Sequence, residues 1–296
     1  MWQSLHFRLL TIATVCCVWL SAPDGSVAQK LGAIKAAASG DSKPASSSSN
    51  DHDRSHDRRK RRHRHDLHCG PDCDECSSSA FSDFTGDVLL TALSSPFVVP
   101  RALVGDTDFA EIEFPALPYS DEGASPFDGI FETGDSSQII FRGQYGDDFS
   151  GLSHASGRLL WDSSWRLGID TEFFYRREEL SQGSDELWNG DFNVVYTFAK
   201  SEDAQFRVGA GVNWLTDRSD TFSGFNFTYG ADFFPAEPFV ISADLDWGNV
   251  GEASLFHGRT TIGVTRNGWG LFTGYDYLKI EDVDVHAWIN GVELRF

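Results

Sequence analysis

The amino-acid sequence predicts an all-β protein: a closed antiparallel up-and-down transmembrane β-barrel of about 10 strands (8–12), preceded by a disordered N-terminal extension. Three observations lead to this prediction. From Ser136 onward apolar and polar residues alternate with a period of two, aromatic residues gather near the ends of the apolar faces, and short and longer connections alternate along the chain. After the N-terminus, no apolar stretch reaches the ~20 residues that a spanning helix needs.

The charge of the chain is uneven. There are 24 Lys and Arg residues against 44 Asp and Glu residues, which gives a net charge of −20. Residues 1–100 carry 11 basic and 11 acidic residues, so the whole acidic excess lies in residues 101–296. A protein that binds duplex nucleic acid needs a basic face, and this balance therefore excludes nucleic acid as a main partner.

Residues 1–28 have the pattern of a secretory signal peptide. Arg8 supplies the positive charge, and the apolar stretch from Leu9 to Leu20 has 12 residues, too few for a stop-transfer helix. Ser26 and Ala28 are the small residues expected before a cleavage site, which would leave Gln29 as the first residue of the exported chain. The alternative interpretation is an uncleaved anchor.

Residues 29–79 are rich in His, Arg, Asp and Ser and show no apolar period, so we expect a disordered linker in the periplasm. Such a segment could make weak contacts with envelope polysaccharide. At its end, a C-x3-C-x2-C motif follows a histidine; the residues are His68, Cys69, Cys73 and Cys76. Three thiolates and an imidazole could hold zinc, whereas an exported protein could equally form a disulfide with one odd thiol. No other cofactor is expected.

Residues 80–135 predict a short helix followed by a loop. Val88 to Leu93 could lie on one helical face, and we expect this helix to end before Ser95 and Pro96. Residues 117–135 are rich in Pro, Gly, Ser and Asp. The segment could form a periplasmic cap, a plug inside the barrel, or a linker.

Residues 136–296 form the predicted barrel. The strand from 222 to 234 shows the pattern, since Phe225 and Phe227 lie on one face while Asn226 and Thr228 lie on the other. The ten predicted strands span residues 137–147, 153–162, 165–176, 187–199, 204–216, 222–234, 238–248, 254–266, 268–278 and 285–296. The longer connections, predicted to face outward, are 147–152, 177–186, 216–221, 248–253 and 279–284.

The polar faces carry charges of both signs rather than ordinary surface residues. A narrow barrel is filled by its own side chains, and buried charges must be paired, so these residues predict an internal network of ion pairs. The predicted lumen network consists of Arg142, Arg158, Asp170, Glu172, Arg207, Asp232, Asp244, Asp246, Arg259, Asp276, Glu293 and Arg295.

The end of the chain carries Trp288, Val292, Leu294 and Phe296 on one face of the last strand. This ending resembles the C-terminal assembly signal of Gram-negative outer-membrane β-barrels. The resemblance covers residues 136–296, is to the class, and identifies no particular family. It implies an outer-membrane location, contact with outer-membrane lipid, and recognition by the barrel-assembly machinery through the C-terminal strand.

Three histidines near predicted outer strand ends, His154, His257 and His286, are weak candidates for catalysis in an outer-membrane hydrolase or lipid A-modifying enzyme. Histidines at polar strand ends are also ordinary, and no extended motif links these three. The outer connections are acidic and could bind divalent cations that bridge lipid phosphates, or could simply be solvated.

The predicted function is therefore a structural or envelope-interaction role for an outer-membrane barrel whose lumen is filled by a charged network. The alternatives are a narrow porin-like channel for small solutes, an outer-membrane hydrolase or lipid A-modifying enzyme, and a soluble periplasmic β-barrel that binds an apolar ligand.

Overall fold

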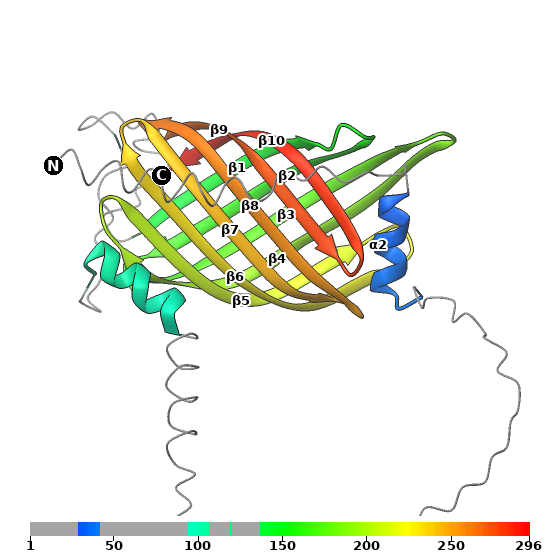
Figure 1. Ribbon diagram of the computed structural model, residues 1–296, viewed down its shortest axis with the longest axis horizontal. Helices are drawn as coiled ribbons and strands as arrows, with labels where there is room; N and C mark the ends of the chain where they lie inside the picture. Colours follow the sequence, from blue (N-terminus) through cyan, green and yellow to red (C-terminus); the bar gives the residue numbers. More distant parts are fainter. Residues whose placement is uncertain (1–28, 42–93, 107–118, 120–136) are drawn as a thin grey trace, which may run out of the picture.

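Ten antiparallel strands form a closed barrel (Figure 1), so the predicted fold class is confirmed. The structure is a computed structural model and describes residues 29–41, 94–106, 119 and 137–296. Each strand pairs with its neighbours in sequence. The strands are β1 (Ser137–Asp147), β2 (Leu152–Ser163), β3 (Leu167–Leu180), β4 (Gly183–Lys200), β5 (Ala204–Thr216), β6 (Thr221–Ala236), β7 (Phe239–Val250), β8 (Ala253–Arg266), β9 (Trp269–Ile280) and β10 (Val283–Arg295).

The sheet closes because β1 pairs with β10, from Ile140 opposite Arg295 to Asp147 opposite Trp288. With an even number of strands, the chain enters and leaves the barrel at the same end. We call this the turn end, and the opposite end, which carries the β1–β2, β3–β4, β5–β6, β7–β8 and β9–β10 connections, the loop end. A closed sheet leaves no unpaired strand edge.

The connections differ from the prediction. The segment expected to be an outer loop at 177–186 is instead a continuation of β3 and β4, which pair as far as Leu180 and Gly183. Extended hairpins, rather than long loops, therefore form the loop end, and the predicted alternation of connection length is mostly absent. Cross-strand pairing here continues beyond the point where turn-forming residues appear in the sequence.

The period-two pattern separates the two surfaces of the wall. In β3, Phe173 is 51% exposed on the outside, whereas Glu172 is 4% exposed inside. Phe174 interrupts the alternation in the sequence because it is an aromatic residue on the inner face, where it is buried.

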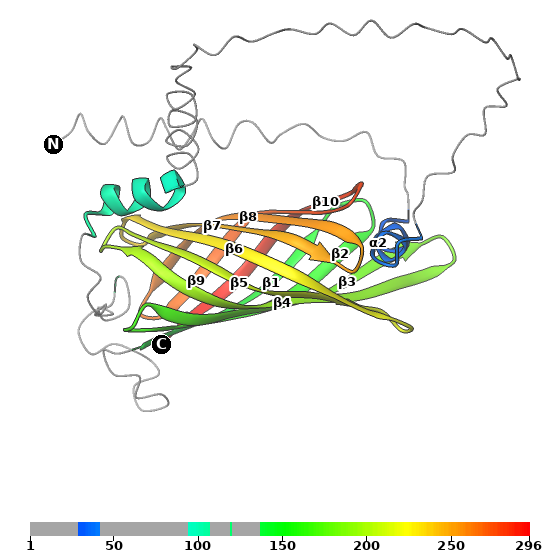
Figure 2. The same cartoon turned by 90° about the horizontal axis from the view of Figure 1, so that it is seen from below.

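Residues 94–104 form a helix that lies against the outer wall at the turn end (Figure 2). Phe97 packs on Phe198 with ring centroids 5.3 Å apart, and the hydroxyl of Tyr229 donates a hydrogen bond to the carbonyl of Pro96 at 3.0 Å. This helix includes Ser95 and Pro96, before which the sequence predicted a helix to end. The predicted start at Val88–Leu93 lies outside the described residues.

Asp106 fixes the end of this helical segment to the barrel. Its carboxylate accepts hydrogen bonds from the guanidinium of Arg166 at 2.7 and 3.0 Å and from the backbone N–H of Lys200 at 3.0 Å. Of the predicted cap or plug, the structure describes residues 94–106 and Tyr119. Residues 94–106 cover the outer wall, and the Tyr119 ring packs against Phe234 with ring centroids 6.4 Å apart.

A nine-residue helix, α2 (Lys30–Ala38), occupies the loop end (Figure 1). It lies within residues 29–79, which were predicted to be a disordered linker, so that prediction is wrong for this part; the rest of the linker lies outside the described residues. Of the helices that the structure describes, none is long and apolar enough to span a bilayer.

We expect Gly211→Ala to destabilise the barrel. A Cβ at this position would clash with the backbone carbonyl of Phe192 on the adjacent strand, which a side-chain rotation cannot relieve. The expected cost is about 1–3 kcal/mol, as for other overpacking changes, and should appear as a lower temperature for the heat-induced shift in gel migration. The matched control is Gly157→Ala, which meets no atom within 4 Å; equal effects of the two changes would contradict this account.

Candidate functional site

Asp244 lies at the centre of the lumen and faces arginines from four strands. Its carboxylate oxygens are 2.8 Å from Arg158 Nη1, 3.3 Å from Arg259 Nη2, 3.8 Å from Arg142 Nη1 and 3.9 Å from Arg207 Nη2. All five side chains are buried. A buried carboxylate shared by several arginines holds together strands that are distant in sequence.

The neighbouring acids complete the neutralisation of these arginines. Asp170 binds Arg158 through both carboxylate oxygens, and Glu172 accepts a hydrogen bond from Arg259 at 2.6 Å. Such charge-assisted hydrogen bonds are among the stronger side-chain hydrogen bonds, above all the bidentate pair between Arg158 and Asp170.

A second group of charges lies nearer the turn end. Asp232 accepts hydrogen bonds from Arg207 Nη1 and from the hydroxyl of Ser242, both at 2.6 Å. Glu293 pairs with Arg142 and Arg295. A cavity lined by Arg142, Arg158, Arg207 and Asp232, among others, has a volume of about 10 Å³, and roughly this much space holds a single water molecule. The lumen is packed here.

The structure brings together the residues of the predicted lumen network, because all of them are buried inside the barrel. They are Arg142, Arg158, Asp170, Glu172, Arg207, Asp232, Asp244, Asp246, Arg259, Asp276, Glu293 and Arg295. Arg176 and Asp191 are also buried inside but were not in the predicted set. Their positions in the alternation place them on the same faces as the others, and this signal could have identified them.

Towards the loop end, a histidine layer follows the arginine network. His257 lies between two carboxylates, with Nδ1 3.2 Å from Asp246 and Nε2 2.8 Å from Asp276. Phe174 packs edge-on against this histidine, and the Arg176 guanidinium lies 4.7 Å from the centroid of the Phe174 ring. The aromatic residue that interrupts the β3 alternation thus lies between the His257 ring and the Arg176 guanidinium.

The three candidate catalytic histidines do not form one site. His154 and His257 are buried in the lumen beneath α2, whereas His286 is on the outer wall, where its ring packs against Tyr275 and Tyr277. The bonds of His257 are to two aspartates rather than to a nucleophile. The arrangement gives no support to a hydrolase.

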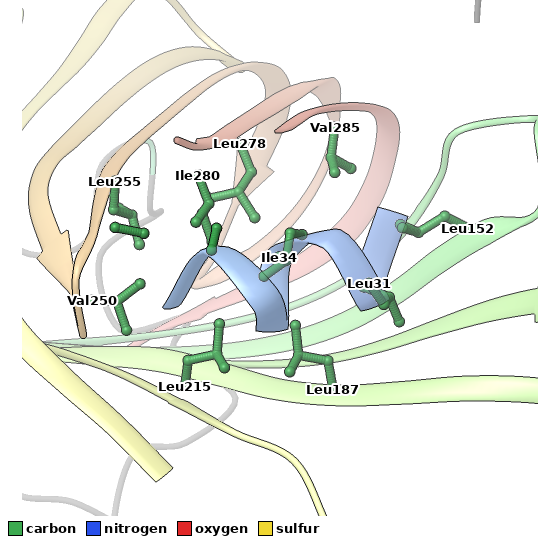
Figure 3. Packing of buried hydrophobic residues seen from close by; sticks show 12 residues of the cluster. Leu31, Ile34, Leu152, Leu187, Leu215, Val250, Leu255, Leu278, Ile280 and Val285 are labelled. Carbon is green, nitrogen blue, oxygen red and sulfur yellow. The ribbon is translucent and has the colours of Figure 1, made fainter. Parts of the chain in front are cut away.

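An apolar ring lines the loop-end mouth of the barrel. The side chains project inward from the ends of seven strands and surround α2 (Figure 3); they are Leu152, Leu187, Leu215, Val250, Ala253, Leu255, Leu278, Ile280 and Val285. Leu31 and Ile34 of α2 point into this ring and are both 0% exposed. The ring and the two helix side chains together close the mouth.

Four carboxylates around this ring bind the polar groups of α2. Both oxygens of Glu178 accept backbone N–H groups, from Lys30 at 2.8 Å and from Leu31 at 2.9 Å. This carboxylate therefore caps the positive end of the helix. We call the four residues the acidic rim; they are Asp148, Glu178, Asp185 and Asp217.

The two lysines of α2 reach the rest of the acidic rim. Lys30 Nζ lies 2.7 Å from Asp148, and Lys35 Nζ lies 2.6 Å from Asp185 and 3.8 Å from Asp217. Burial alone would raise the pKa of Asp148, but hydrogen bonds from Lys30, Ser150 and the backbone hold that pKa below its usual value. Acidic connections that were candidates for divalent cations thus bind a cationic helix.

The helical state of α2 depends on this binding. An isolated helix of nine residues is too short to be stable in water. Complete burial of Leu31 and Ile34 supplies about 1.5–3 kcal/mol each. The ion pairs of Lys30 and Lys35 are partly solvated and contribute less. The two apolar side chains are therefore the main source of the stability of the bound helix.

The position of α2 bears on the predicted orientation. The connections that contact it were predicted to face the exterior, whereas residues 29–79 were predicted to lie in the periplasm. These two predictions conflict for residues 30–38, because α2 contacts Asp148, Asp185 and Asp217 at the loop end. On the predicted orientation, α2 lies on the external side.

The remaining predicted sites are only partly described. His68, Cys69, Cys73 and Cys76 lie outside the described residues, as does the signal segment 1–28. Within the described ranges, no group of three or more His, Cys, Asp or Glu residues could hold a metal ion. Trp288 and Val292 point outward from β10, and the assembly signal stays a prediction.

Comparison with known proteins identifies no family. No family model matches the chain, and no curated protein does. Solved structures with a similar barrel include the outer membrane protein Ail of Yersinia pestis, at 17% identity over 54% of this chain and 99% of that one, with a TM-score of 0.31. The NanC porin matches at 10% identity over 53% of this chain and 98% of that one, with a TM-score of 0.34.

Neisserial surface protein A is a third solved structure with a similar barrel. It matches at 10% identity over 54% of this chain and 96% of its own, with a TM-score of 0.30. These likenesses concern the fold alone, and the function has to be inferred from the residues of this chain.

We expect Asp244→Asn to destabilise the barrel strongly. The change removes the charge that several buried arginines share, and loss of one partner of a buried pair typically costs about 3–5 kcal/mol. Urea unfolding of the protein in lipid vesicles would measure the cost. The control is Arg218→Gln, since Arg218 is 87% exposed and lies 3.6 Å from Glu186; a surface pair is worth at most ~1 kcal/mol.

We also expect the binding of α2 to weaken in acid. The pKa of Asp148 is lower in the folded state than in the unfolded chain. Its contribution to the stability of bound α2 is therefore complete above the unfolded-state pKa of about 3.9, and it is lost as the pH falls through the folded-state pKa. Protease cleavage at Lys30 and Lys35, assayed with an acid-tolerant protease, should increase below about pH 4. Asp148→Asn should remove part of this pH dependence; an unchanged profile would contradict the role of Asp148.

Proposed function

We propose that this chain is an exported outer-membrane β-barrel with a sealed lumen, which serves as a structural protein or as a surface for interactions in the cell envelope. One observation carries the proposal: apolar side chains cover the outside of a closed wall whose inside is filled by ion pairs. In water the exposed apolar outside would be unfavourable. In a bilayer the apolar outside contacts lipid, and the charges on the inside are paired with one another.

Every strand contributes to the apolar outer wall. The exposed large hydrophobic residues of β1 to β10 are Phe141, Tyr145, Leu159, Trp161, Leu167, Phe173, Trp188, Phe192, Val194, Val212, Phe225, Phe239, Leu245, Trp247, Ile262, Val264, Trp269, Leu271, Trp288 and Val292. A soluble barrel that binds an apolar ligand would have its apolar surface inside. This wall has the opposite arrangement, which favours the membrane location over the soluble alternative.

Aromatic residues form two exposed bands near the ends of the wall. Trp161, Trp165, Phe239 and Trp269 lie near the turn end, and Tyr145, Trp188, Trp247 and Trp288 lie near the loop end. Bands of Trp and Tyr are typical of the two membrane–water interfaces. Their separation along the strands supports a barrel that spans the bilayer.

The packed lumen favours a sealed barrel over a channel. Arginines and carboxylates occupy the centre, and the apolar side chains of α2 lie in the loop-end mouth; both features support a closed lumen. The same closure argues against a soluble substrate reaching His257 from the loop end. A surface role is therefore the function that the geometry supports best.

Two measurements test this proposal. The protein should be extracted from envelopes by detergent and not by salt or osmotic shock, and release by osmotic shock alone would overturn the membrane location. In planar bilayers the wild-type protein should give no stepwise current. Regular conductance steps would overturn the sealed barrel in favour of the channel for small solutes.

A further inference from the structure

The loop-end mouth has the features of a binding site that recognises one kind of ligand. Its interior is the apolar ring that surrounds Leu31 and Ile34, and its edge is the acidic rim. Without a covering group, this ring would expose a concave apolar surface to water. Large apolar patches are seldom left uncovered on the water-facing surfaces of proteins. The mouth therefore requires an apolar occupant of matching shape.

The polar contacts restrict that occupant further. Glu178 uses both oxygens to accept consecutive backbone N–H groups, which is an arrangement that the first turn of a helix provides. Asp148 and Asp185 lie on either side and bind ammonium groups. The matching ligand is a short helix with aliphatic residues three positions apart and a lysine beside each of them.

The resident helix is held by contacts that permit exchange. Two fully buried side chains, Leu31 and Ile34, supply most of its apolar contact, while the ion pairs at the rim are partly solvated. In sequence, 52 residues separate the last described residue after α2, Asp41, from the next described one. A tether of that length sets the effective concentration of the attached helix at no more than roughly millimolar, and a free ligand can compete with a helix at that concentration.

We propose that the loop-end mouth is a binding site for a short helix that carries two aliphatic side chains and two lysines, and that α2 is the occupant supplied by the chain itself. A second polypeptide with the same pattern, leucine and isoleucine three residues apart and flanking lysines, binds in its place. The inference deepens the proposed function, since it rests on the loop end as the interaction surface and names the class of partner.

The experiment uses the full-length protein in detergent micelles and a fluorescent peptide with the sequence of residues 29–41. In the variant Leu31→Asp/Ile34→Asp, α2 no longer fills the apolar ring, and the peptide should bind saturably, as measured by fluorescence anisotropy. Binding to the wild-type protein should be weaker by about tenfold or more, because the tethered helix competes. Heat-modifiable gel migration verifies that the variant barrel is closed.

Two matched controls separate specific binding from adsorption to micelles. A peptide that carries the same two aspartate substitutions should not bind the variant. Adding Glu178→Gln to the variant should weaken binding of the unmodified peptide, whereas adding Glu202→Gln, an exposed position at the turn end, should not.

The proposal is overturned if the closed variant binds no peptide, if the aspartate-substituted peptide binds equally well, or if wild-type and variant proteins bind with equal affinity. These outcomes are independent of the membrane location, because the binding is measured in detergent. Conversely, release of the protein by osmotic shock would overturn the membrane location and leave the binding result unaffected.

Discussion

Charge neutralisation inside a narrow closed sheet is the constraint on which the rest of this structure depends. Ten strands bring every second side chain into a space with almost no room for water, so each buried charge needs a partner from another strand. Asp244 meets this need for arginines of β1, β2, β5 and β8 at once. The contacts cross the lumen, and they therefore stabilise the barrel in a way that hairpin pairing alone does not.

The two ends of the barrel are completed by different means. At the turn end, the 94–104 helix covers the outer wall, and Asp106 binds it to Arg166 and the backbone of Lys200. At the loop end, α2 closes the interior through an apolar ring and an acidic rim. One helix thus extends the apolar exterior while the other seals the mouth, although both come from the region that precedes the barrel in sequence.

The comparison of prediction and structure separates local from long-range information. Strand positions, the closed fold and the inner and outer faces could be predicted because period-two alternation is a local property of each strand. Phe174 is an exception to this pattern, because its ring faces the lumen and packs there against Arg176 and His257. The polar sequence of residues 177–186 predicts a loop, whereas the structure pairs β3 with β4 as far as Leu180 and Gly183, because a local pattern does not reveal cross-strand pairing.

By itself, the sequence determined a ten-stranded closed barrel with an apolar exterior and a charged interior, because alternation and the pairing of buried charges leave few other solutions. Only the tertiary structure decided which segment occupies the loop-end mouth of the barrel. The nine residues of α2 are too short to form a stable helix alone, and Lys30 finds its partners Asp148 and Glu178 more than a hundred residues away. No local pattern encodes contacts of that kind, so the helix and its binding site become visible only when the strands have brought the rim together.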